Sequence, residues 1–189
     1  MLEDDQISSK GIIAIVVLFM TACINAEAQR TMKGQSVIGA ETSFNGISAG
    51  ATINYSQYTL NGFWYVGISG NDYYALYSDS DILRYNHICG YGGYLFRLVG
   101  TRSRSINLYG GGEIIVGLEV IDPFDELPSQ FKASMEKYRF LYGVCPKILA
   151  EFFISPRFAF TIFGTLPINF SSAISNVNYN IGGGFRIML

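Results

Sequence analysis

The feature that most constrains the fold is an alternation of apolar and polar residues with a period of two. It is clearest from Tyr138 to Phe153, where even positions are mostly apolar or aromatic and odd positions carry charges of both signs. Successive side chains of a β-strand point to opposite faces, so this period predicts a strand with two chemically different faces. The same alternation recurs in residues 104–119 and 176–189. The sequence therefore predicts an all-β protein.

Five weaker segments complete a predicted set of eight strands. They cover residues 35–44, 46–57, 62–77, 83–98 and 156–167. Within 62–77, Gly70-Asn71-Asp72 could instead form a turn or a bulge. The expected arrangement is an antiparallel up-and-down barrel.

An up-and-down order places successive connections alternately at the two ends of the barrel. One end then receives the connections near 45, 78–82, 120–136 and 168–175, and the other receives those near 58–61, 99–103 and 154–156. The longer connections fall together at the first end. Long outer loops and short periplasmic turns are typical of outer-membrane barrels.

Alternation alone does not say which face points outward, because a soluble lipocalin-like barrel also alternates, with its apolar face inside. Charged residues make up only 15% of the chain, against about 25% in soluble domains. The polar face mixes both signs, which suits ion pairs in a narrow lumen; its charged residues are Arg97, Glu113, Glu119, Arg139, Lys147, Glu151 and Arg186. Aromatic residues near strand ends suit the girdles of a membrane barrel, and they include Tyr138, Phe140, Phe152 and Phe153. We therefore predict an outer-membrane-type barrel whose even face in 138–153 points to lipid and whose lumen is filled by side chains.

Residues 1–28 are predicted to be a signal peptide rather than part of the fold. An apolar run from Gly11 to Ile24 follows Lys10 and precedes Ala26-Glu27-Ala28, which offers small residues to signal peptidase. An uncleaved membrane anchor is the alternative. The run is shorter than the roughly 20 residues that a spanning helix needs, which favours the signal peptide.

The mature chain is expected to begin after Ala28, so that residues 29–189 form one barrel domain. Cys23 offers a lipoprotein cleavage site as an alternative, although Met20 stands where Leu is usual. Without the predicted signal, which holds Lys10 and four acidic residues, 12 basic and 11 acidic residues remain. This balance gives no electrostatic footprint for nucleic acid.

His87 is the only histidine in the chain. It excludes a metal cluster with several histidines and leaves no second imidazole. A serine–histidine–acid site needs positioned partners, and no spacing in the sequence indicates them. We predict a histidine packed on a strand, and no catalytic, cofactor-binding or metal site.

Cys89 and Cys145 remain after removal of the signal peptide. Two cysteines can pair in an oxidising compartment. These two lie on the fourth and sixth predicted strands, which are not neighbours in an up-and-down order. Two unpaired packing residues are therefore favoured over a disulfide, which needs a short Cα separation.

Two glycine runs, Gly110-Gly111-Gly112 and Gly182-Gly183-Gly184, resemble phosphate loops only in composition. Neither is followed by Lys-Ser/Thr and a helix, as a phosphate loop would be. Within strands, such glycines are expected to permit curvature or close packing. In the longest connection, Asp122, Asp125 and Glu126 could bind a cation, although a solvated loop is the preferred interpretation.

Several short motifs follow one another along the mature chain. They are Ala26–Arg30 with Lys33-Gly34-Gln35, Tyr91–Phe96, Gly110–Gly112 with Gly117–Glu119, Phe140–Gly143 with Ala150-Glu151 and Pro156–Phe158, and Tyr179–Phe185. In their order and spacing they resemble the TraO family of Bacteroidetes conjugative transposon proteins. One difference is the end Ile187-Met188-Leu189, which lacks the terminal aromatic residue of many outer-membrane barrels.

The resemblance implies a structural, non-enzymatic component of a conjugal DNA-transfer apparatus at the outer membrane. It implies outer-membrane lipid and other conjugal transfer proteins as partners. The near-neutral charge leads us to expect no direct binding of nucleic acid, and no small-molecule substrate is evident. Two alternatives stay open: a stand-alone barrel of the OmpX or OmpA type for adhesion or envelope integrity, and an outer-membrane lipid enzyme that depends on His87.

Overall fold

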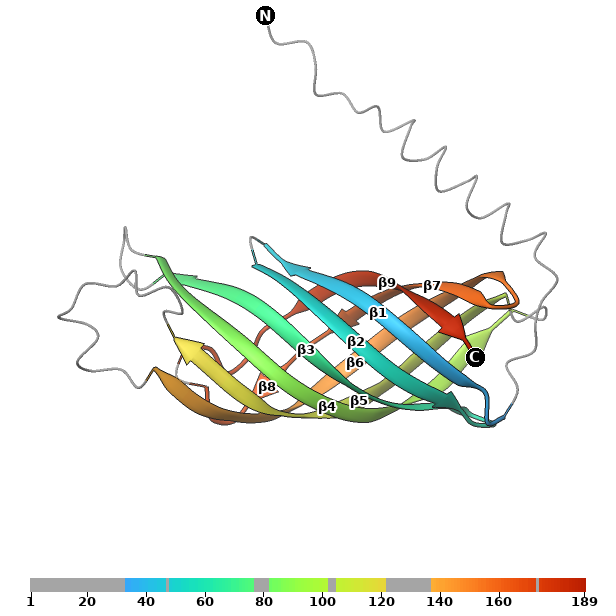
Figure 1. The fold of residues 1–189 in the computed structure, drawn as a ribbon, viewed down its shortest axis with the longest axis horizontal. Helices are drawn as coiled ribbons and strands as arrows, with labels where there is room; N and C mark the ends of the chain where they lie inside the picture. Colours follow the sequence, from blue (N-terminus) through green and yellow to red (C-terminus); the bar gives the residue numbers. More distant parts are fainter. Residues whose placement is uncertain (1–32, 47, 77–81, 102–104, 122–136, 173) are drawn as a thin grey trace, which may run out of the picture.

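The strands form one closed antiparallel barrel in the computed structural model (Figure 1). The structure describes residues 33–46, 48–76, 82–101, 105–121, 137–172 and 174–189. The long strands are β1 (Ser36–Asn45), β2 (Ser48–Tyr58), β3 (Gly62–Leu76), β4 (Ile82–Gly100), β5 (Ile106–Ile121), β6 (Tyr138–Ser155), β7 (Phe158–Thr165) and β9 (Asn180–Met188). A two-residue strand, β8 (Ile168–Asn169), lies between β7 and β9 in the sequence.

Each long strand pairs with the next long strand in the chain, and β9 pairs with β1 to close the barrel. At this closing seam Phe185 lies opposite Ala40. Each long strand therefore has a hydrogen-bonded neighbour on both sides, which removes the exposed edges of an open sheet. The predicted up-and-down order of eight strands is confirmed.

β8 continues β7 beyond a break at Pro167. Asn169 of β8 lies opposite Gly143 of β6, in the same register that relates β7 to β6. Proline has no N–H to give to a ladder, and Pro146 stands at the same level on β6, where its carbonyl accepts from Leu166 N at 3.0 Å. The strand predicted over 156–167 thus corresponds to β7, and beyond a break where two prolines come together it continues as β8 into the predicted connection 168–175.

Two details differ from the sequence-based expectation. The last strand begins at Asn180 rather than at 176, because the residues before it pair with the β8 region, where Asn178 N donates to Pro167 O at 3.0 Å. β3 runs without interruption through Gly70-Asn71-Asp72, opposite residues 49–51 of β2. This segment forms neither a turn nor a bulge.

The two faces of the wall differ as the alternation predicts. On β6 the even positions up to Ile148 are exposed and the odd positions from Leu141 are buried. Every long strand exposes large apolar side chains on the outside, among them Ile38, Ile53, Ile68, Ile88, Ile114, Ile148, Ile162 and Phe185. The apolar face is therefore the outer one, in contrast to a soluble barrel with an apolar interior. Phe153 was wrongly placed in an outer girdle: its odd position turns it inward, and it is 3% exposed.

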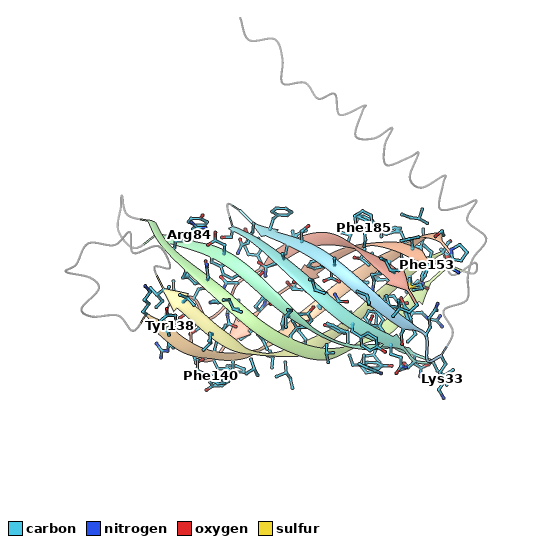
Figure 2. All side chains as sticks on the ribbon, viewed as in Figure 1. Lys33, Arg84, Tyr138, Phe140, Phe153 and Phe185 are labelled. Atoms are coloured by element: carbon cyan, nitrogen blue, oxygen red, sulfur yellow. The ribbon has the colours of Figure 1, made fainter. Side chains whose placement is uncertain are left out.

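Lys33, labelled in Figure 2, and Leu189, at the C mark of Figure 1, lie at the same end of the barrel, which we call the terminal end. The connections at this end are residues 59–61, 101–105 and 156–157. The opposite end, called the loop end, receives the connections 46–47, 77–81, 122–137 and 170–179. The two longest connections, 122–137 and 170–179, share the loop end, as predicted for the longest one.

Some predictions lie outside the described residues. They are the signal peptide 1–28 with Cys23, and the acidic residues Asp122, Asp125 and Glu126. Within the described ranges, no helix has the length and apolar character needed to cross a membrane.

Candidate functional site

The lumen gathers most of the buried charged residues and is the candidate functional site. Side chains occupy the interior along the length of the barrel (Figure 2). The buried ionisable residues include Glu41, His87, Glu119, Lys147, Glu151 and Arg186. A buried charge is costly unless it is paired and hydrogen-bonded. The partners of each group therefore decide what the lumen can do.

Arg186 of β9 forms a cluster toward the terminal end. Its guanidinium donates to Glu151 Oε1 at 2.9 Å and to the Tyr58 hydroxyl at 3.3 Å. Its Cζ lies 4.2 Å from the centroid of the Phe63 ring. Tyr58 and Tyr109 both donate to Glu151. These groups come from β2, β3, β5, β6 and β9, so the cluster fills the lumen from wall to wall.

Lys147 of β6 forms a second pair farther along the lumen. Its Nζ donates to Glu41 Oε2 of β1 at 2.9 Å, and it lies 4.6 Å from the Phe163 ring centroid and 5.3 Å from that of Tyr65. The Tyr65 hydroxyl donates to Glu113 Oε2 at 2.7 Å. One ammonium thus faces a carboxylate and two aromatic rings, which together stabilise its charge.

A small cavity of about 60 Å³ lies in the lumen beside this pair. Its lining includes Glu41, Lys147, His87 and Asn169. The side-chain amide atoms of Asn169 are buried without a hydrogen-bond partner among the described atoms. One water occupies about 30 Å³ in the liquid, so the cavity has room for a few waters only. The lumen is filled rather than open, as predicted.

His87 of β4 pairs with Glu119 of β5, with 3.0 Å between Nε2 and Oε2. Its ring packs against Tyr73 and Tyr85, at centroid distances of 5.0 and 5.3 Å. Ser172 donates to the same Glu119 oxygen at 2.6 Å. In a serine–histidine–acid site the histidine stands between the serine and the acid. Here Glu119 stands between His87 and Ser172. The arrangement orders Glu119 and does not activate Ser172.

The charged residues predicted to face the lumen differ in their burial in the structure. Glu119, Lys147, Glu151 and Arg186 are buried, and Glu113 is half-buried. Arg97 and Arg139 are exposed, because they stand at opposite rims, where the inner face meets the outside. Glu41 was missed by the sequence analysis. It lies between Ala40 and Thr42, whose small side chains give a weak alternation signal.

Cys89 and Cys145 are both buried and free, so the interpretation as unpaired residues is confirmed. Cys89 lies opposite Gly117 of β5, which lies opposite Leu141 of β6. Cys145 is therefore four residues farther along β6 than the position level with Cys89. At about 3.3 Å per residue, this offset is about 13 Å, well beyond the roughly 7 Å that separates the Cα atoms of a disulfide.

The glycine runs provide close backbone approach, as the sequence analysis expected. A Cβ atom on Gly111 would lie 2.2 Å from the Tyr94 carbonyl oxygen, and one on Gly184 would lie 2.4 Å from that of Ala40. Both runs lie within strands and not before a helix. Among the residues that the structure describes, no group of three His, Cys, Asp or Glu side chains is placed to hold a metal ion.

Solved structures with a similar fold are outer-membrane-type barrels. Neisserial surface protein A is 10% identical with a TM-score of 0.50, over 82% of this chain and 95% of that chain. Ail, the attachment invasion locus protein of Yersinia pestis, is 15% identical with a TM-score of 0.47, over 82% and 100%. The N-terminal β-barrel domain of Pseudomonas aeruginosa OprF is 8% identical with a TM-score of 0.45, over 83% and 98%. At such identities the likeness shows the fold alone. No curated protein matches the chain.

A family model for the conjugative transposon protein TraO matches residues 27–189. The match includes every strand of the barrel, from β1 to β9. It agrees with the resemblance carried by the glycine-aromatic motifs. The chain therefore belongs to the TraO family of conjugative transposon proteins.

Proposed function

We propose that this protein is an outer-membrane β-barrel component of a conjugal DNA-transfer apparatus, with a structural rather than a catalytic role. The observation that carries the proposal is the family match over residues 27–189. The family description ties its members to conjugative transposons, whose transfer between cells needs an envelope-spanning apparatus. The apolar outer wall of the closed barrel supports a position in a lipid bilayer.

In the proposed orientation, the loop end faces the outside and the terminal end faces the periplasm. This orientation gives the two longest connections to the outer side, where outer-membrane barrels carry long loops. Outward aromatic pairs stand toward both ends of the wall. Tyr55 and Trp64 lie toward the terminal end with ring centroids 5.6 Å apart, and Phe140 and Tyr142 lie toward the loop end at 6.1 Å. Such positions suit the two aromatic girdles of a membrane barrel.

The filled lumen favours a structural role. The Arg186 cluster and the Lys147–Glu41 pair occupy the interior at two levels, so transferred DNA would pass beside this barrel and not through it. The partners in this proposal are outer-membrane lipid and other conjugal transfer proteins. It includes no enzymatic activity, no small-molecule substrate and no direct grip on nucleic acid.

The proposal is tested by a clean deletion of the gene in a donor that carries the conjugative element. Transfer frequency should fall to background and return when the wild-type gene is supplied in trans. A matched control supplies the variant Ile114→Arg, which puts a charge on the lipid-facing wall and should not restore transfer. Fractionation of the complemented donor should place the wild-type protein in the outer membrane. Normal transfer by the deletion strain would refute the proposal.

A stand-alone barrel for adhesion or envelope integrity is the second candidate. The observation in its favour is the closed sheet, which leaves no strand edge of the barrel that needs a partner chain. Under this alternative the deletion strain transfers DNA normally, but it adheres differently to surfaces or becomes sensitive to detergents. Replacing residues 122–136 by a short turn should then reproduce the adhesion change.

A further inference from the structure

Exposed basic residues encircle the terminal end of the barrel. Lys33 precedes β1, Arg97 stands near the end of β4, and Arg157 lies in the turn between β6 and β7. Around the barrel, β2 and β3 lie between β1, which follows Lys33, and β4, which holds Arg97. β5 lies between β4 and the β6–β7 hairpin, whose turn holds Arg157. Figure 2 marks Lys33 at this end. The cations therefore lie around the rim and do not form one patch.

Exposed acidic side chains do not accompany these cations in the described part of the terminal end. The acidic residue nearest in the chain to the β6–β7 turn, Glu151, is fully buried and paired with Arg186. In the sequence, the connection 101–105 adds two arginines and no acid. The connections at the loop end instead hold Asp79, Asp81, Asp122, Asp125, Glu126 and Glu136 against Lys132 and Lys137. In the sequence, the connections of the two ends thus differ in the sign of their net charge.

Apolar side chains lie beside the cations on the same rim. Leu60, in the β2–β3 turn, is 73% exposed. A bulge between Arg97 and Val99 breaks the alternation of β4, so that Leu98 and Val99 are exposed one after the other. Val99 pairs with Leu108, an outward residue of β5. The side chains of Leu98 and Val99 therefore face the surroundings of the barrel and not its lumen.

We propose that the terminal end binds anionic phospholipid headgroups through Lys33, Arg97 and Arg157. At a bilayer surface, long basic side chains reach the phosphates while neighbouring apolar side chains enter the acyl region. A ring of cations fits lipid, which surrounds a barrel, better than an acidic protein, which would dock on one side. The inference rests on the membrane position proposed above but not on the role in DNA transfer.

The test compares phospholipid binding to purified full-length protein by native mass spectrometry, with phosphatidylglycerol and phosphatidylcholine titrated separately. The test variant carries Lys33→Gln, Arg97→Gln and Arg157→Gln. The matched control carries Lys132→Gln, Lys137→Gln and Arg139→Gln, the same loss of charge at the loop end. Each basic residue near a membrane surface contributes about fivefold to affinity. The test variant should lose on the order of a hundredfold in preference for phosphatidylglycerol, and the control should retain it.

Equal preference for phosphatidylglycerol in the wild type and the test variant would overturn the inference, and so would an equal loss in the control. If the triple variant does not fold, the three single variants should each lose about fivefold. An acidic protein as the partner would give a different result. The wild type would then bind poly-glutamate in phosphatidylcholine, the test variant would not, and neither would prefer phosphatidylglycerol. This outcome would refute the lipid assignment. Loss of transfer on deletion together with no lipid preference would refute this inference alone. A wild-type barrel that is monomeric and soluble without detergent would refute the membrane position as well.

Discussion

Replacement of Arg186 by methionine should strongly destabilise the barrel. The substitution removes the guanidinium that donates to Glu151 and Tyr58 and retains an apolar side chain beside Phe63. Glu151, which is 0% exposed, keeps only the hydroxyl donors of Tyr58 and Tyr109. Removal of one partner from a buried ion pair costs about 3–5 kcal/mol. We expect the free energy of unfolding to fall by this amount.

The measurement is urea unfolding of the protein in lipid vesicles or detergent micelles, followed by the fluorescence of Trp64. This residue is the only tryptophan and stands on the outer wall, so its emission changes when the wall leaves the lipid. Arg139→Met is the matched control, because Arg139 is exposed at the loop end. Its free energy of unfolding should change by no more than about 0.5 kcal/mol.

The double variant Arg186→Met/Glu151→Leu separates the ion pair from simple loss of packing. It leaves no unpaired charge in the cluster, and apolar replacement of a whole buried pair is often neutral or stabilising. It should therefore be more stable than Arg186→Met alone, with a coupling energy of about 0.5–3 kcal/mol. A cost below about 1 kcal/mol for the single variant, or additive effects of the two substitutions, would contradict a stabilising role for the Arg186–Glu151 pair.

Three further perturbations test the wall and the packing. Ile114→Arg, at an outward position that is 66% exposed, should lower the free energy of unfolding in a bilayer by about 2–4 kcal/mol. Leu60→Arg at the rim should lower it by about 0–1 kcal/mol. Equal effects of the two variants on unfolding in vesicles would contradict a lipid-facing wall. Gly184→Ala should cost about 1–3 kcal/mol by overpacking, while Gly70→Ala, with open space around the added methyl group, should leave the unfolding midpoint unchanged. Both lumenal cysteines should be alkylated in protein that is unfolded without reductant, and a disulfide-linked peptide in the mass spectrum would contradict the strand register.

The wall of the barrel was predictable because the period of two depends only on local backbone geometry. In 138–153 the alternation predicted the strand and its two different faces, and the low charge content of the chain indicated which face points outward. The lumenal pairs were not predictable in the same way. Lys147 and Glu41 are 106 residues apart, and they meet only because β9 and β1 close the sheet. The inner alternation likewise assigned Arg97 and Arg139 to the lumen, since it carries no information on where a strand leaves the wall and a rim begins.

Closure of the lumen restricts how this barrel can act on anything outside it. The Arg186 cluster and the Lys147–Glu41 pair fill the interior at separate levels, and the cavity beside the second pair is close to the size of a few waters. His87, the residue on which an enzymatic role depends, is 3% exposed and bonded to Glu119 inside the same lumen. Any contact with lipid, protein or DNA must therefore be made by the outer wall or by the two ends. Of these surfaces, the terminal end combines basic side chains with exposed apolar side chains. Substitutions there should alter the proposed lipid binding without disturbing the buried ion pairs that stabilise the barrel.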